Sequence, residues 1–150
     1  MNNKPSVSSS SASGSIGLNL PSITLQEIFA VAYYKDGSDS TFDGYNTLIS
    51  GPGSSGAYRI FGSTGSANWY TGNSQWNFND SGNFKNGATS SSDTALPMPA
   101  TLLRFTSSAP RTEIRGILYN LGVDSRGWIG GVGEIIGLPR ISSVSDREKV

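Results

Sequence analysis

The 150-residue chain contains no cysteine and no histidine. These absences exclude disulfides, thiol chemistry, Cys/His zinc sites and any catalytic triad with a histidine base. The 11 basic residues balance the 11 acidic residues, so no positive excess is available to neutralise a nucleic-acid backbone. No apolar run is long enough to span a membrane, and the N-terminus lacks the apolar core of a signal peptide. We therefore expect neither nucleic acid nor a membrane as a partner.

Charge is also scarce, since only 15% of the residues are charged, against about a quarter in an average domain. Serine, threonine, asparagine and glycine are abundant, strong helix formers are few, and aromatic residues reach 10%. Turn formers combined with aromatic residues are typical of β-structure with long surface loops. The composition therefore predicts an all-β domain.

The first part of the chain differs from the rest. Residues 1–22 are rich in serine, with a continuous serine run at 8–11, and Lys4 is the only charge before Glu27. Such a segment buries too little apolar surface to offset its ordering entropy. We expect residues 1–22 to form a flexible arm or linker; the alternative is an extended arm that orders against a neighbouring subunit. Residues 23–150 are then the folded domain.

Short β-type segments separated by glycine, asparagine and proline follow the arm. An Asn-Gly pair at Asn86, the strongest short hairpin signal, lies near the middle of the chain. The number and spacing of these segments predict a two-sheet antiparallel β-sandwich, or jelly roll. The expected strands cover residues 23–34, 45–50, 57–62, 68–70, 75–78, 84–89, 101–106, 113–119 and 128–136.

A helix signal occurs only at the C-terminal end. Ser145 and Glu148 have the spacing of a capping box, with Ser145 as the N-cap and Glu148 at the third helical position. The chain ends at Val150, so we expect a vestigial helical turn, either because the sequence is cut from something longer or because a tail was lost.

The C-terminal third carries a family resemblance. Residues 126–136 contain an aromatic residue and glycines before an apolar strand that includes Glu134, and a turn and a short polar helix follow. This stretch resembles the closing strand of concanavalin A-like lectin/glucanase (laminin-G-like) jelly rolls, and Asn86 with Gly87 resembles a hairpin of the same family. The version here is most similar to copies found in bacteriophage and bacterial surface proteins. The resemblance implies a β-sandwich over residues 23–150.

Enzymes on that fold use pairs of carboxylates, because glycoside hydrolysis needs two acids at a defined separation. On a strand, such a pair would be two acids spaced by two or four residues on one face. Glu27, Glu113 and Glu134 each stand alone on their predicted strands. We therefore expect a protein that is not an enzyme, with no catalytic residues, and we rank glycoside hydrolysis third among the functions considered.

A calcium site is a weaker alternative. Asp36, Asp39 and Asp43 supply oxygen ligands in one loop, and laminin-G-like domains often hold calcium at the rim. Their spacing does not match an EF-hand, and aspartate beside glycine and serine usually forms turns. The sequence favours turns, so we expect no cofactor.

The central aromatic residues suggest a glycan-binding face. The stretch has few aliphatic residues but many asparagines, and aromatic rings that stack on sugars would need such polar neighbours. Trp69, Trp76 and Phe78 could equally fill the core of a sandwich. The candidate ligand-binding residues are Tyr70, Trp76, Asp80 and Asn83.

The expected function is that of a structural or accessory module in a larger assembly. The resemblance points to a bacteriophage virion, as a head decoration or tail-fibre module, made in the host cytoplasm. Its partners would be other virion proteins, contacted through residues 1–22, and a homo-oligomer is an open possibility. The alternative is a carbohydrate-binding adhesin module at a cell surface.

Overall fold

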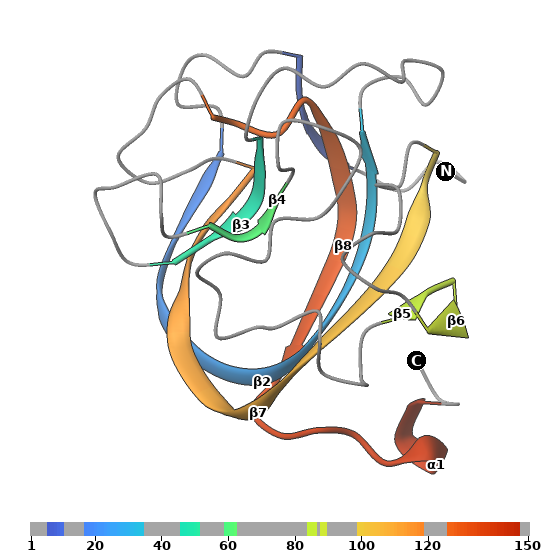
Figure 1. Cartoon of the computed structure of the whole chain (residues 1–150). Coiled ribbons are helices and arrows are strands. Elements are labelled where there is room, and N and C mark those ends of the chain that lie inside the picture. Colours follow the sequence, from blue (N-terminus) through green and yellow to red (C-terminus); the bar gives the residue numbers. More distant parts are fainter. Residues whose placement is uncertain are drawn as a thin grey trace.

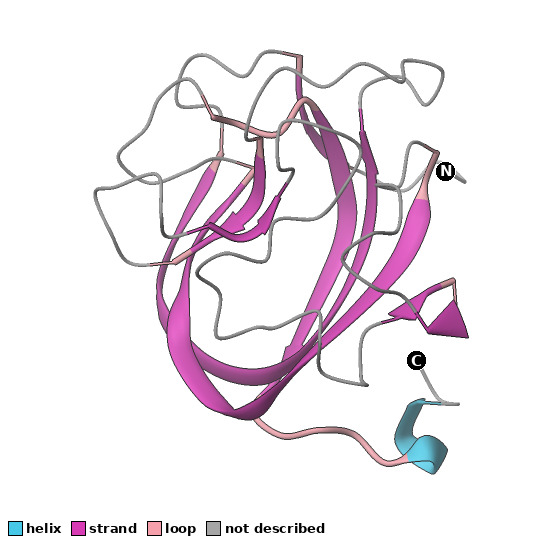
Figure 2. Ribbon diagram, in the orientation of Figure 1, coloured by secondary structure: helices cyan, strands magenta, loops and turns pink. Residues whose placement is uncertain are grey.

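A computed structural model describes residues 6–10, 17–34, 46–51, 59–62, 84–86, 88–89, 99–118 and 126–147. Over these residues the chain is antiparallel β-structure with a single helical turn (Figure 2). The expected all-β class is thus confirmed. The elements are β1 (Val7–Ser9), β2 (Leu18–Tyr34), β3 (Thr47–Ser50), β4 (Arg59–Gly62), β5 (Phe84–Lys85), β6 (Ala88–Thr89), β7 (Thr101–Ile117), β8 (Gly130–Leu138) and α1 (Val144–Arg147).

The strands form a sandwich of two antiparallel sheets that share β2 and β7. The hydrogen-bonded order is β1-β8-β2-β7-β3-β4, with β5 on β7 and β6 on β5. Both long strands curve through a bend at the bottom of Figure 1, so that their two halves rise on opposite sides. The β8 layer contains β1, β8, β5, β6, residues 27–34 of β2 and residues 101–106 of β7. The β3 layer contains β3, β4, residues 18–25 of β2 and residues 111–117 of β7.

The bend is encoded by extra residues in β7. Leu25 pairs with Arg111 and Glu27 pairs with Thr106, so residues 107–110 stand opposite Gln26 alone. This segment includes Pro110, which cannot donate a ladder hydrogen bond. The Gln26 amide donates to the Ser107 carbonyl at 3.3 Å, which closes the bulge. Bulges of this kind let a strand pass from one sheet of a sandwich to the other. For this reason the two strands expected at 101–106 and 113–119 are a single element.

The core lies between the two layers. Alternate residues of β2, among them Ile28, Ala30 and Tyr34, are buried in it. Trp128 is fully buried; its ring meets Tyr34 edge-on at 4.9 Å, and its indole N–H donates to the Tyr33 carbonyl at 2.9 Å. A buried tryptophan with its polar group satisfied contributes strongly to packing.

Two parts of the expected arm, residues 1–22, are strands of the sandwich. β1 pairs with β8, placing Val7 opposite Val132 and Ser9 opposite Gly130. β2 begins at Leu18 rather than at residue 23, and Leu18 pairs with Ile117. At these positions the serine-rich segment is extended, and its backbone is hydrogen-bonded to its own domain.

Two turn signals have different outcomes. The Asn-Gly hairpin is confirmed: Asn86 joins β5 to β6 with a positive φ of 50°. The predicted N-cap is wrong by two residues, because the hydroxyl of Ser143, not that of Ser145, accepts the Asp146 N–H at 3.1 Å. Ser143 and Asp146 have the same capping-box spacing as the predicted pair. The sequence therefore contains two overlapping boxes, and α1 uses the first.

Candidate functional site

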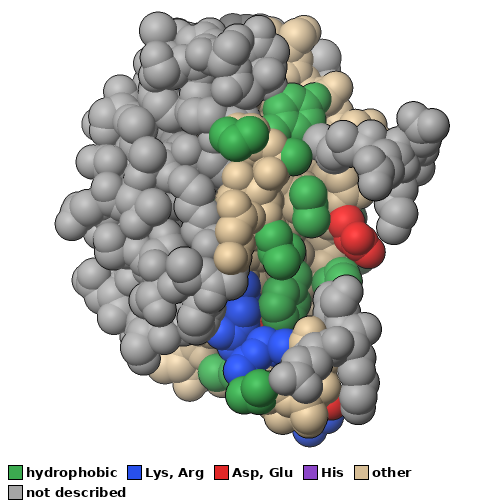
Figure 3. Space-filling view, turned by 90° about the vertical axis from the view of Figure 1, so that its right-hand side faces the viewer, with side chains coloured by type: hydrophobic (Ala, Val, Ile, Leu, Met, Phe, Trp, Pro, Cys, Tyr) green, Lys and Arg blue, Asp and Glu red, His purple; other side chains and the backbone are tan. Residues whose placement is uncertain are grey.

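The outer face of the β8 layer carries an apolar groove. Residues 28, 30, 32 and 34 of β2 point into the core, so Phe29 and Val31 point to the opposite side. Ile136 of β8 lies opposite Phe29 in the register, and Leu102 of β7 lies opposite Val31. Apolar side chains therefore run across three neighbouring strands on the side away from the core. Figure 3 shows them as a row down this face.

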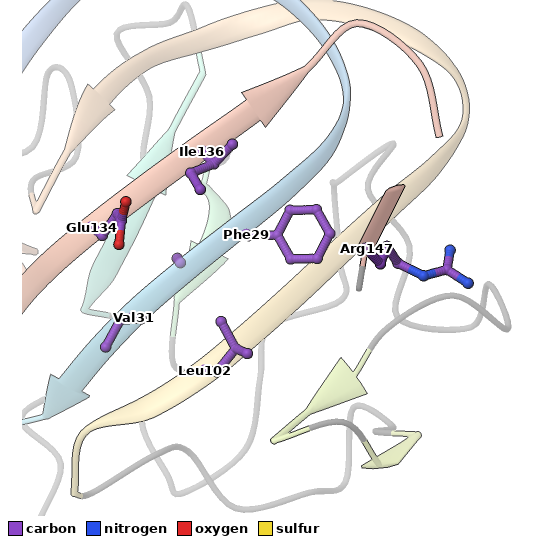
Figure 4. A pocket seen from close by; sticks show the side chains of 7 residues that line it. Phe29, Val31, Leu102, Glu134, Ile136 and Arg147 are labelled. Atoms are coloured by element: carbon purple, nitrogen blue, oxygen red, sulfur yellow. The ribbon is translucent and has the colours of Figure 1, made fainter. Parts of the chain in front are cut away.

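This outer groove has a volume of about 240 Å³. Phe29 lies near its centre, with Ile136 and Leu102 on the two flanking strands (Figure 4). Glu134 lies toward one end of the row and Arg147 of α1 lies beyond Phe29 at the other (Figure 4). The groove is lined by Phe29, Ala30, Val31, Leu102, Glu134, Ile136 and Arg147.

Tyr33 extends the apolar row beyond the groove. A Cβ atom at Gly131 would lie only 2.6 Å from the Tyr33 ring, so the ring rests directly on the β8 backbone. Glycine is needed here because a side chain would displace the ring.

An ion pair closes the face near the bend. The Arg104 Nε group donates to Glu27 Oε1 at 2.5 Å, and Glu27 is fully buried. The second carboxylate oxygen accepts the Ser142 backbone N–H at 2.6 Å. The Arg104 guanidinium also lies 5.9 Å from the centre of the Phe29 ring, within the range of a cation–π contact. One carboxylate thus ties β2, β7 and the C-terminal segment together.

The C-terminal segment continues this polar border. The Arg147 side chain donates to the Ser142 carbonyl at 2.9 Å, which holds the guanidinium at the groove. The hydroxyl of Ser143 donates to Asp146 at 2.7 Å, and this hydrogen bond is the main reason that the pKa of Asp146 lies below its ordinary value. The backbone N–H of Ser143 and the positive charge of Arg140 lower it further. The short helix that carries Arg147 is therefore fixed at its start by a charged cap.

The chemistry of this face fits binding. Both oxygens of Glu27 are engaged in the ion pair and the backbone bond, and Asp146 serves the helix cap. The ion pair found in the described ranges joins Glu27 to Arg104 and does not involve Glu134, which is exposed. Within the same ranges, no group of three acidic residues converges as a metal site would require, and no helix has the length and apolar character of a membrane span.

The residues predicted to bind ligands are elsewhere. Tyr70, Trp76, Asp80 and Asn83 lie outside the described residues, as do the calcium candidates Asp36, Asp39 and Asp43. Their roles stay predictions.

Sequence reasoning missed the outer groove, although a signal was present. Residues 28–34 are apolar at every position, whereas a strand with one solvated face alternates apolar with polar residues. An apolar residue at every position indicates a strand that is covered on both faces. That pattern predicts that the outer side of the strand is covered, and Phe29 is 8% exposed within the single chain, whereas Val31 is half-buried.

The molecule is thus a β-sandwich with an apolar groove on the outer face of one layer, bordered by charged groups. Comparison with protein-family models, with curated proteins and with solved structures found no match to this chain. The resemblance to laminin-G-like jelly rolls therefore remains a prediction, supported by the sequence of the closing strand.

Proposed function

We propose that this protein is a structural module of a larger assembly and that it docks through the outer groove against a second copy of itself. The observation that carries the proposal is the row of apolar side chains on the outer face of the β8 layer. One face of an antiparallel sheet packs on the core, and the other is polar when it faces water. An apolar outer face instead indicates a surface that is covered in the working state.

The exposure of individual side chains supports an interface. Leu102, on the groove wall, is 46% exposed, and Val144 of α1, the helix that brings Arg147 to the groove, is 64% exposed. Ile141 in the same C-terminal segment is also exposed. Apolar residues gathered at a groove with charged groups at its ends match the anatomy of a protein–protein interface.

The charges favour a second copy as the occupant. Glu134 and Arg147 lie at opposite ends of the apolar row (Figure 4). In a two-fold symmetric interface, residue i of one chain contacts residue j of the other, and the reverse contact also forms. A two-fold axis that crosses the apolar row at right angles would place Arg147 of each copy opposite Glu134 of the other. The groove is therefore complementary to itself in charge.

The resemblance of residues 126–136 to the phage-associated branch of laminin-G-like domains supports a virion as the setting, as a head decoration or fibre module. Two acids of the described residues, Glu27 and Asp146, are engaged in structural contacts, which supports a non-catalytic role for this face. Residues 1–22, which include the edge strand β1, supply a further means of contact with other virion proteins. A cell-surface location is the alternative setting.

The test is the molecular mass of the full chain in solution, measured by sedimentation at several concentrations. We expect a dimer for the natural sequence. Glu134→Arg and Arg147→Glu should each shift dissociation to about 100-fold higher concentration, because two like-charged contacts then form and each costs more than 1 kcal/mol. An equimolar mixture of the two variants should recover the dimer, since the mixed pair restores both opposite-charge contacts.

Arg140→Glu is the matched control, because Arg140 is an exposed arginine of the same segment but is not a groove residue. It should leave the mass unchanged. A monomer at every concentration would overturn the proposal, and so would single variants that associate like the natural chain. A mixture that stays monomeric would refute the two-fold arrangement.

The carbohydrate-binding alternative depends on Tyr70, Trp76, Asp80 and Asn83. Its support is the combination of aromatic and amide side chains in a stretch with few aliphatic residues. A glycan array probed with the full chain tests it. Binding that is lost in Trp76→Ala but retained in Glu134→Arg would favour this alternative over the assembly role.

A further inference from the structure

A second hollow lies inside the sandwich, between its two layers. Leu20, Ile23 and Ile117 line it from the β3 layer, and Ile28 and Ile135 line it from the β8 layer. Its volume is about 220 Å³. This inner cavity is separate from the outer groove, because Ile135 and Ile136 are neighbours on β8 and point to opposite faces. The described residues that line it are Leu20, Ile23, Leu25, Ile28, Ile49, Ile117, Ile135 and Gly137.

The position of the cavity follows from the bend. Close to the bend, Gly137 has no side chain, and a Cβ atom there would lie 2.5 Å from Leu25 Cδ1. Leu25 therefore packs against bare backbone at this end of the cavity, where Gly137 is exposed. Farther from the bend the layers are lined by isoleucines, whose branched side chains are stiff and adapt poorly to fill gaps.

The described residues of the lining include no charged or polar side chain. Protein interiors are packed as densely as organic crystals, so a hollow of this size is unusual. A buried water needs two or more polar partners, and purely apolar cavities stay dry. An engineered apolar cavity of about 150 Å³ lined by similar residues takes up benzene or xenon. The inner cavity exceeds that volume and has the same chemistry.

Solvent reaches the cavity past lining residues that are only partly buried. Leu20, Ile23 and Ile135 are only partly buried, whereas Ile28 and Ile49 are fully buried. The side of the cavity lined by Ile28 and Ile49 is thus buried, and the side lined by Leu20, Ile23 and Ile135 is accessible from solvent.

We propose that the inner cavity is a binding site for a small neutral apolar group, either an aromatic ring or the hydrocarbon tail of an amphiphile. The absence of polar lining excludes a carboxylate or hydroxyl group from the interior. The head group of an amphiphile would have to remain at the opening, near Leu20 and Ile23. This site does not depend on the proposed dimer.

The test uses the full chain with ¹³C-labelled isoleucine methyl groups, titrated with benzene. The lining isoleucines, Ile23, Ile28, Ile49, Ile117 and Ile135, should shift together and saturate along one binding curve. Ile136 reports on the outer groove and should not move. A parallel titration with decanoate distinguishes an aromatic ring from a hydrocarbon tail as the occupant. If the cavity binds hydrocarbon tails, the shifts of the lining isoleucines saturate with decanoate as well. If it binds only rings, they do not.

Ile135→Phe fills the cavity and should weaken benzene binding by about tenfold or more, equivalent to at least 1.4 kcal/mol. Ile136→Phe places the same side chain on the opposite face of the same strand and should leave the benzene curve unchanged. If Ile135→Phe fails to fold, Ile117→Phe fills the cavity from the other layer. The proposal is overturned if the lining methyl groups show no saturable shift up to the solubility limit of benzene, or if Ile136 shifts in their place.

Discussion

The two faces of the β8 layer use the same three strands in different ways. On the inner face, Ile28, Ala30 and Leu103 pack in a core without charge. On the outer face, the apolar row ends in charged groups, with the buried Glu27–Arg104 pair near the bend. Each face also contains a hollow, of about 220 Å³ inside and about 240 Å³ outside. The two hollows have similar volumes, but among the described residues only the outer groove is bordered by charged side chains.

This difference separates two kinds of recognition. An uncharged cavity selects its occupant by size and polarity, because burial of apolar area is non-directional. A groove with opposite charges at its ends also selects orientation, since a reversed partner would bring like charges together. The inner face is therefore suited to a small apolar molecule, and the outer face to a protein surface held in one register.

The largest expected effect comes from the ion pair of the outer face. Glu27→Gln keeps the shape of the side chain but removes the negative charge with which the buried Arg104 pairs. We expect the free energy of unfolding to fall by about 3–5 kcal/mol, as for other buried pairs that lose one partner. Urea denaturation followed by tryptophan fluorescence measures this loss.

The double variant Glu27→Leu/Arg104→Met distinguishes the charge from the packing. If the uncompensated charge causes the loss, removing both charges should recover most of the stability. A Glu27→Gln protein as stable as the natural one would show that the outer face does not depend on this pair.

The second prediction compares neighbouring leucines on opposite faces of β7. Leu103 is 2% exposed in the core, and Leu102 is 46% exposed on the outer groove. Leu103→Ala should lower the free energy of unfolding by about 2–5 kcal/mol, because it removes buried apolar surface and leaves a cavity. Leu102→Ala should cost less than about 1 kcal/mol.

Both variants are to be measured at concentrations where the chain is monomeric. Equal losses would mean that the outer face is already covered within a single chain. That outcome would contradict the difference between the two faces.

Much of the strand pattern was predictable from local sequence. The apolar segments and the Asn86 turn correspond to strands and a hairpin because period-two burial and turn chemistry are local properties. The joining of residues 101–106 and 113–119 into one bent strand was not predictable in this way. It depends on how residues 107–110 bulge opposite Gln26, which is a contact between distant segments.

The candidate site was less predictable than the fold. Glu27 and Arg104 are 77 residues apart, and neither has a local pattern that marks it as half of an ion pair. The outer groove joins Phe29, Ile136 and Arg147 from three elements, so its charges are brought to its ends only by the topology. The continuous apolar run at 28–34 was the one local sign of a covered outer face, whereas the overlapping capping boxes show that one motif can fit a sequence twice.

The smallest expected effect concerns the helix cap at the border of the outer groove. The pKa of Asp146 is lowered chiefly by the Ser143 hydroxyl, so this carboxylate stabilises the folded turn at pH values above its unfolded pKa. The stabilisation is lost as the pH falls through the lower folded pKa. In Ser143→Ala the pKa of Asp146 should rise toward its ordinary value, as measured by NMR titration of the carboxyl group.

Acid should then loosen the Val144 methyl groups on the outer side while leaving Ile28 in the core unchanged. If the titration of Asp146 is the same in both proteins, the Ser143 backbone N–H and Arg140, and not the hydroxyl, set the pKa. If acid loosens Ile28 together with Val144, the inner and outer faces of the β8 layer lose order together and not separately.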